Sequence, residues 1–170
     1  MGVRTLGPED VETLRSIRLR ALADSPEQFS STWEREALRT VEDWQRWIET
    51  GATFVFEDRG VVGGDGPDPV GLVAAVPDDD EPDPDRPGVV WLMAMWVEPA
   101  ARGTGAAGAL VDAVVGWARH HGATTVRLHV VEKNARARRL YERYGFRVTG
   151  SAECAGRMEI AMECAIGVVT

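Results

Sequence analysis

Residues 89–97 are nine consecutive apolar residues that lead into a glycine-rich turn at 102–108. Because every position in the run is apolar, the strand that it predicts is buried on both faces, as central strands are. After the turn, Leu110, Val114 and Trp117 recur at roughly helical spacing. A buried strand, a tight turn and a helix in immediate succession predict a layered fold of the α/β class.

Strand and helix patterns continue along the whole chain. We expect further strands at 3–6, 52–57, 70–76, 125–131, 146–154 and 157–164. We expect helices that begin near Pro8, Pro26, Val41, Ala106 and Asn134. The glycine- and proline-rich segment 60–69 is expected to be a connection. This order predicts an α/β (α+β) domain over 1–170, with one mixed sheet of about six to seven strands and helices on both faces.

The chain has 27 acidic and 19 basic residues, for a formal net charge of −8. Six of the acids and a single arginine lie in 78–88, which we expect to be an acidic surface loop. An acidic chain is a poor partner for nucleic acid or for an anionic membrane. If the loop overhangs an acceptor cleft it could attract amines, and the alternative is that it only confers solubility.

Two cysteines, Cys154 and Cys164, are too few for a disulfide framework. Residues 1–10 contain no apolar signal region, and the longest apolar run is too short to span a membrane. We therefore expect a cytoplasmic location. The adjacent His120 and His121 end a predicted helix and lack further ligands, so no metal site is expected. Arginine dominates the basic residues, which suggests a GC-rich, bacterial genome.

The glycine-rich turn allows three interpretations. Backbone N–H groups at the start of a helix form a cradle for phosphate, and glycines serve such a turn with or without a ligand. The segment 103–108 also satisfies the dinucleotide-binding pattern G-x-G-x-x-G. That pattern requires an acid near a strand end about 20 residues later, within a long βαβαβ half. Glu132 lies beyond the next strand, so a dinucleotide-binding oxidoreductase is disfavoured.

Two motifs together are more specific than the turn alone. Residues 102–107 read R-x-x-G-x-A, and residues 134–146 read N-x-x-A-x-x-L-Y-E-x-x-G-F. The first resembles the acetyl-CoA motif Q/R-x-x-G-x-G/A of the GNAT superfamily of N-acetyltransferases. The second, in the expected order and separated from the first by a helix and a strand, resembles that superfamily's second signature. The detailed resemblance covers 89–146.

The resemblance implies a GNAT-like sheet that is splayed where it receives acetyl-CoA, the acyl donor. Residues 102–108 would hold the pyrophosphate, and the strand end at 95–97 would pair with the pantetheine and polarise the thioester carbonyl. It assigns cofactor binding to Met95, Trp96, Val97, Arg102, Gly103, Thr104, Gly105, Ala106, Ala107, Gly108, Asn134, Ala137 and Tyr141. Asn134 could instead be only a helix cap.

The resemblance also names the catalytic candidates. Tyr141 matches the tyrosine that protonates the departing thiolate, although it could simply pack its helix. Many members carry a glutamate base in the central strand, but 89–97 has no carboxylate and Trp91 occupies its expected position. His129 stands where the ribosomal-protein N-terminal acetyltransferases have a glutamate, five residues before the conserved Asn. It could be the base or an ordinary strand residue, and a water-relayed base is the further alternative.

The sequence therefore predicts an N-acetyltransferase that moves an acetyl group to a primary amine by direct attack in a ternary complex. We expect a small-molecule or amino-acid-like acceptor, with a protein N-terminus as the alternative. A non-catalytic acyl-CoA-binding module and a different acyl donor stay open, and the resemblance allows for a homodimer. Candidates for the acceptor wall are Phe29, Trp33, Trp44, Trp47 and Arg157.

Overall fold

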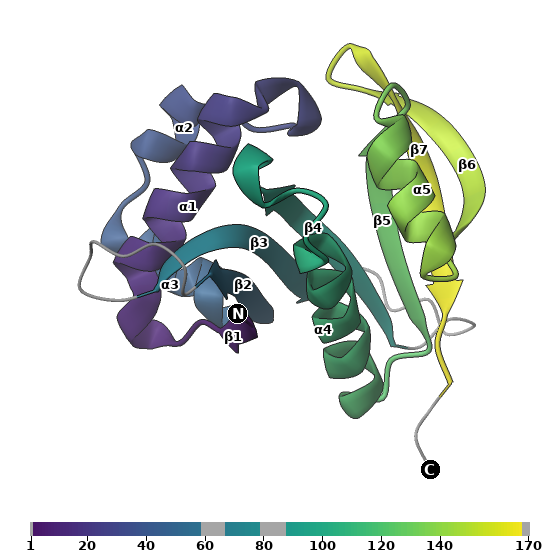
Figure 1. The fold of residues 1–170 in the computed structure, drawn as a ribbon, viewed down its shortest axis with the longest axis horizontal. Coiled ribbons are helices and arrows are strands. Elements are labelled where there is room, and N and C mark those ends of the chain that lie inside the picture. Colours follow the sequence, from purple (N-terminus) through teal and green to yellow (C-terminus); the bar gives the residue numbers. More distant parts are fainter. Residues whose placement is uncertain (1, 59–66, 79–87, 168–170) are drawn as a thin grey trace.

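The computed structural model describes residues 2–58, 67–78 and 88–167 and contains one seven-stranded sheet (Figure 1). Its strands are β1 (Gly2–Thr5), β2 (Ala52–Asp58), β3 (Asp68–Pro77), β4 (Val89–Val97), β5 (Thr125–Val131), β6 (Arg147–Cys154) and β7 (Arg157–Ala165). The order across the sheet is β1-β2-β3-β4-β5-β7-β6, with β4 and β5 parallel and the other neighbours antiparallel. The predicted mixed sheet is confirmed, and β4 is its central strand.

Helices cover both faces of the sheet, as predicted. They are α1 (Val11–Asp24), α2 (Trp33–Ala37), α3 (Val41–Glu49), α4 (Ala106–His120) and α5 (Ala135–Arg143). The helix expected near Pro26 is a single 3-10 turn, η2 (Pro26–Gln28), and a separate α2 follows it. It stops there because Phe29 adopts an extended conformation, with φ −120° and ψ 147°. Two further 3-10 turns, η1 (Pro8–Asp10) and η3 (Pro99–Ala101), precede α1 and α4.

Alternating side chains of the strands build a separate core on each face. In β2, Phe54 and Phe56 pack in the cluster that contains Leu110 of α4, whereas Val55 between them packs with Ile17 of α1. This alternation follows from the two-residue period of a strand. The α4 cluster extends to Tyr141 of α5, so α4 and α5 share one face, while α1 and α3 cover the other (Figure 1).

The sheet opens between β4 and β5. These strands pair only through Val89, Val90 and Trp91 of β4, and beyond Trp91 no β5 residue in the described chain pairs with β4. On its other side, β4 holds one extra residue against β3, and Ala94 in this bulge has a φ of 58°. Bulges increase local twist and bend a strand, so the bulge accounts for the divergence. The predicted splay is confirmed.

The structure describes only parts of the two connections that precede and follow β3. Most of the acidic segment 78–88 and of the connection 60–69 lies outside the described residues, so their roles remain predictions.

Cys154 pairs with Arg157 at the turn between β6 and β7, and Cys164 lies seven residues further along β7. The two thiols are therefore about 23 Å apart at roughly 3.3 Å per residue. Among the described helices, none is long and apolar enough to cross a membrane.

Candidate active site

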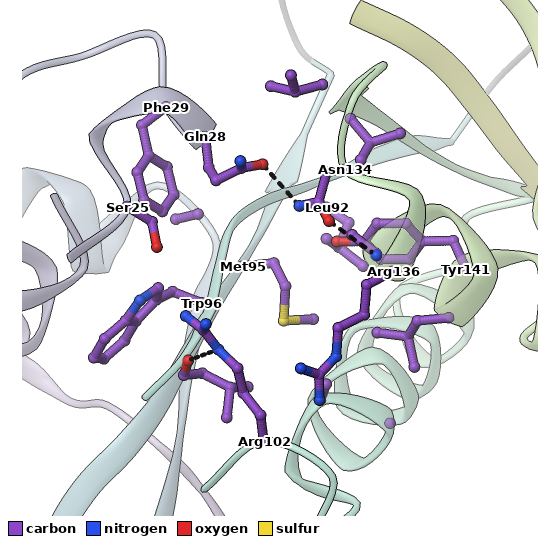
Figure 2. A pocket seen from close by; sticks show the side chains of 18 of the residues that line it. Ser25, Gln28, Phe29, Leu92, Met95, Trp96, Arg102, Asn134, Arg136 and Tyr141 are labelled. Carbon is purple, nitrogen blue, oxygen red and sulfur yellow. Dashed lines mark hydrogen bonds between the residues drawn. The ribbon is translucent and has the colours of Figure 1, made fainter. Parts of the chain in front are cut away.

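A cavity of about 570 Å³ occupies the gap between β4 and β5 (Figure 2). Twelve of the predicted site residues line it: Met95, Trp96, Val97, Arg102, Gly103, Gly105, Ala107, Gly108, His129, Asn134, Ala137 and Tyr141. Thr104 and Ala106 are not part of the lining. The hydroxyl of Thr104 donates to the carbonyl of Ala101 at 2.6 Å, and Ala106 is buried in the core. The fold thus collects most of the predicted site around one opening in the sheet.

The turn before α4 exposes unpaired backbone donors. Gly103 and Gly105 have φ values of 82° and 91°, a region that glycine adopts without the steric cost of a Cβ. The first helical hydrogen bond at this end runs from the Ala109 N–H to the Gly105 carbonyl at 3.0 Å. The N–H groups before Ala109 therefore precede the regular hydrogen-bond ladder of α4. Together with the helix dipole they form a site suited to phosphate oxygens.

Gly108 has a structural role that the motif did not predict. A Cβ at this position would collide with the hydroxyl of Tyr144, which follows α5. The glycine therefore permits close packing between the start of α4 and the end of α5. Since Gly108 also lines the cavity, this close packing helps to form the cavity wall.

The side chain of Arg102 is held by neighbouring residues. Its Nε donates to the Val97 carbonyl at 2.9 Å, and its Nη2 donates to Asp24 Oδ2 at 3.0 Å. The same carboxylate oxygen accepts bonds from the Ser25 hydroxyl at 2.7 Å and the Trp96 indole N–H at 3.0 Å. These bonds, the one from Ser25 first, lower the pKa of Asp24. Asp24 thus ties α1 to the end of β4 and to the turn.

The freed edge of β4 supplies backbone groups to the cavity. In a regular sheet the residues after Trp91 would pair with β5, but the splay removes that partner. Ala94 and Met95 instead line the cavity with this edge. Strand N–H and C=O groups that lack a neighbouring strand can bond an extended ligand, as in β-strand addition. An N–H in the bulge can also donate to a carbonyl oxygen where negative charge develops.

Asn134 and Tyr141 bring α5 to the cavity. Asn134 Oδ1 accepts the Ala137 N–H at 3.1 Å, which caps the helix, and its Nδ2 donates to Gln28 Oε1 at 2.7 Å. The ring of Tyr141 packs against Phe146, with centroids 5.7 Å apart, while its hydroxyl points toward the cavity (Figure 2). Burial raises the pKa of Tyr141 well above its ordinary value. The tyrosine therefore packs its helix and also presents a protonated hydroxyl.

His129 lies on β5 with its side chain half exposed. Its Nδ1 is 3.6 Å from Glu159 Oε2, and its ring meets the ring of Trp91 edge-on at 5.2 Å. His129 lines both the first cavity and a second one. The imidazole therefore stands where two ligands could meet, with a carboxylate beside it to orient it.

Sequence reasoning missed several residues that line the first cavity: Gln28, Leu140, Arg136 and Arg143. The three on α5 recur at spacings of four and three, which places them on one helix face. That face also contains Ala137 and Tyr141, so helical spacing from the motif could have identified them. No local pattern marks Gln28, because its contact with Asn134 spans 106 residues.

The second cavity, of about 600 Å³, adjoins the first. The two share Gln28, Phe29, Leu92, Met93, Ala94 and His129. Of the residues predicted for the acceptor wall, Phe29, Trp47 and Arg157 line this cavity. Trp44 is instead buried in the α1 core, and Trp33 is exposed outside both linings. Within the described part of the chain, no cluster of three or more His, Cys, Asp or Glu could hold a metal ion.

Residues 18–146 match the sequence profile of the acetyltransferase (GNAT) family. The chain belongs to this family. A GNAT acetyltransferase structure from Streptococcus pneumoniae shares the fold, with a TM-score of 0.78 at 19% identity, covering 97% of this chain and 98% of the other. The yncA putative acetyltransferase from Salmonella typhimurium, solved with acetyl-CoA, has a TM-score of 0.75 at 18% identity and covers 100% of this chain and 96% of its own.

Curated relatives agree with the GNAT classification. A mycothiol acetyltransferase from Parafrankia sp. (strain EAN1pec) is 35% identical over 81% of this chain and 43% of its own length. The chain thus spans less than half the length of that relative. GNAT acetyltransferases use acetyl-CoA. The predicted family and its fold are therefore confirmed, whereas the activity of this chain and the roles of individual site residues remain predictions.

Proposed function

We propose that the protein transfers the acetyl group of acetyl-CoA to a primary amine by direct attack in a ternary complex. The observation that carries this proposal is the meeting of two cavities at the β4 bulge, where Ala94 and His129 line both. One cavity contains the glycine-rich turn and α5, and the other opens on the α1 side of the sheet. Two ligands held in this way react with the advantage of proximity.

In this proposal acetyl-CoA occupies the first cavity. Its pyrophosphate accepts hydrogen bonds from the backbone at 102–108, and its pantetheine follows the freed edge of β4 at 95–97. Arg136 and Arg143 line the same cavity and add positive charge for the phosphates. Asn134 contacts the cofactor through the amide nitrogen that now bonds Gln28. The thioester then lies near Ala94, at the junction with the second cavity.

The chemistry needs a polarised carbonyl and a proton for the leaving group. An N–H of the β4 bulge donates to the thioester oxygen as the neutral amine forms its bond to the carbonyl carbon. The carbon–sulfur bond breaks, and Tyr141 donates its hydroxyl proton to the departing thiolate. Burial raises the pKa of Tyr141, so the phenol is in the donor form at neutral pH. Water returns the proton to the tyrosine between turnovers.

His129 accepts the proton that the amine loses. Its position on both cavity walls gives it access to the acceptor, and Glu159 at 3.6 Å would stabilise the imidazolium that forms. The alternative is a water-relayed base, since His129 is half exposed to solvent. In either case no covalent acetyl-enzyme is required, which agrees with the two-cavity arrangement.

The acceptor is a small molecule or an amino-acid-like amine in this proposal. The mycothiol acetyltransferase relative favours a small-molecule acceptor. The second cavity, with the rings of Phe29, Trp47 and Trp91 in its lining, has a volume typical of small-ligand sites. A protein N-terminus is the alternative, and it would need to reach the junction through this cavity.

A screen for CoA release tests the proposal. The protein is incubated with acetyl-CoA and a panel of amino acids, amino-acid amides, polyamines and short peptides, and free thiol is measured. We expect amine-dependent release, together with calorimetric binding of acetyl-CoA and not of NAD. Binding without turnover of any amine would instead indicate a non-catalytic acyl-CoA-binding module, and binding of NAD alone would indicate an oxidoreductase.

A further inference from the structure

A buried charge cluster forms part of the second cavity. The side chains of Arg18 and Glu36 are 7% and 1% exposed, and two hydrogen bonds of 2.9 Å join them in a bidentate pair. Arg39 approaches the same carboxylate, with its Nη2 3.9 Å from Glu36 Oε1. One carboxylate therefore faces two guanidinium groups, and the cluster keeps one positive charge that no acid within it balances.

Aromatic rings hold both guanidinium groups in place. The rings of Phe29 and Trp47 lie 4.7 Å and 5.3 Å from the guanidinium carbon of Arg18. Trp44 and Trp47 lie 5.3 Å and 5.4 Å from that of Arg39. Cation–π contacts of this kind fix the planar groups without neutralising them. The positive charge is thus pre-organised in the cavity wall.

One donor of the cluster has no partner. The Nη1 of Arg18 is buried and forms no hydrogen bond with any described residue. Buried polar atoms are nearly always hydrogen-bonded, so such an orphan marks a place where a ligand or solvent atom completes the site. Arg39 lines the same cavity with a side chain that is one-third exposed. Together they offer donors to one incoming group.

The other charged groups in the cavity lining do not balance this charge. Asp43 lies 3.7 Å from Arg46 and also interacts electrostatically with Arg39, so two arginines share it, and Arg157 bonds Glu159 at 3.2 Å. Burial alone would raise the pKa of Glu36, but its bonds and charge contact with Arg18 lower it overall, so Glu36 is ionised at neutral pH. Four arginines and three carboxylates line the cavity in total, with His129 in addition.

We propose that Arg18 and Arg39 bind a carboxylate of the acceptor, so that the substrates are amines that also carry a carboxylate, as α-amino acids do. This inference rests on the proposed function. Guanidinium groups match a carboxylate in shape as well as charge. Ala94 and His129 line the same cavity at its junction with the first, where the amine would react. A protein N-terminus has no free α-carboxylate beside its amine and would leave this charge unpaired.

The test compares each amino acid with its own carboxamide as acceptor, using CoA release at saturating acetyl-CoA. For the best acid of the panel we expect kcat/KM to exceed that of its amide by at least about tenfold, mostly through KM. The Arg39→Gln variant should lower this ratio to about two or less, and Arg39→Lys should restore part of it. Arg35→Gln is the matched control, because Arg35 is exposed on α2 outside both cavities and should leave the ratio unchanged.

Arg39→Gln leaves the Arg18–Glu36 pair intact, so it tests the charge without breaking the buried ion pair. Its fold is checked by thermal unfolding and by binding of acetyl-CoA, both expected to match the wild type. Amides or peptides that react as well as acids, or an acid preference that survives in Arg39→Gln, would overturn the inference and leave the proposed function standing. Failure of every acid, amide, polyamine and peptide to release CoA would instead overturn the proposed function.

Discussion

Asn134 Nδ2 donates a 2.7 Å hydrogen bond to Gln28 Oε1 and so joins the start of α5 to η2 across the opening in the sheet (Figure 2). A second link lies nearby, where Arg157 Nη1 donates to the Glu27 carbonyl at 2.8 Å. Residues Glu27 and Gln28 of η2 are thereby bonded to β7 and to the start of α5, which lie across the opening between β4 and β5. Since Gln28 lines both cavities, this crossing marks the border between the cofactor and acceptor spaces.

The two bonds of Asn134 predict separable effects of substitution. Serine at this position keeps a good helix cap but is too short to reach Gln28 or a cofactor. Asn134→Ser should therefore lose only the Gln28 bond, about 1 kcal/mol of stability, and raise KM for acetyl-CoA severalfold. Asn134→Ala should show the same KM and lose about a further 1 kcal/mol, because it removes the helix cap too. Thermal unfolding and initial rates measure both; a wild-type KM in Asn134→Ser would exclude a cofactor contact.

Tyr141→Phe should separate packing from proton transfer. Phenylalanine keeps the ring that packs on Phe146, so the unfolding temperature and KM for acetyl-CoA should change little. Loss of a general acid typically lowers kcat by about 10² or more. The control is Tyr144→Phe, which removes a phenol that packs near Gly108, and its kcat should stay within about threefold. Equal kcat in Tyr141→Phe and the wild type would refute the acid role.

The parts of the site that could be predicted from the sequence are those set by residues close together in the chain. The strand at 89–97 and the helix after it are local patterns, and Asn134 marks the start of α5 by capping chemistry. These features predict the strand, the turn and the helix start, whereas the splay between β4 and β5 was expected only from the resemblance to the GNAT superfamily. Gly108 was predicted for the cofactor, but its contact with Tyr144 becomes visible only when the two helices are packed together.

Contacts between distant segments could not be predicted in the same way. Asp24 binds Arg102 over 78 residues, and Gln28 meets Asn134 over 106. No composition or periodicity in a single sequence specifies such pairs, because they depend on how α1 crosses β4. The acceptor wall was the part predicted least well. Trp33, Trp44 and Trp47 were all candidates for it, and of these three only Trp47 lines the second cavity.

His129→Ala tests the proposed base. If His129 accepts the amine proton, the variant should lose about 10² in kcat/KM across the pH range over which rates are measured. His120→Ala, an exposed histidine at the end of α4, is the control and should keep the wild-type profile. A kcat/KM profile that is unchanged in His129→Ala would remove the residue from the mechanism and leave water as the relay.

Asp24→Asn should weaken the contact with Arg102 in the turn at 102–108 and change how the stability of the fold depends on acidic pH. The pKa of Asp24 in the folded protein is below its ordinary value of 3.8, so its ionised form stabilises the fold above that pH. This contribution is lost as pH falls through the lower, folded-state pKa. The wild type should therefore be more stable than Asp24→Asn near neutral pH, and the difference should shrink as the pH falls below 3.8 and through the lower, folded-state pKa. A gap in unfolding temperature that persists unchanged would contradict this.

Initial rates measured while acetyl-CoA and an accepted amine are both varied test the central claim most directly. Direct attack in a ternary complex predicts double-reciprocal lines that intersect, because both substrates must occupy their cavities before acetyl transfer begins. Intact mass measurement after incubation with acetyl-CoA alone should show the unmodified chain. Parallel lines together with an acetylated chain would mean a ping-pong reaction through a covalent intermediate. That result would contradict direct attack in a ternary complex.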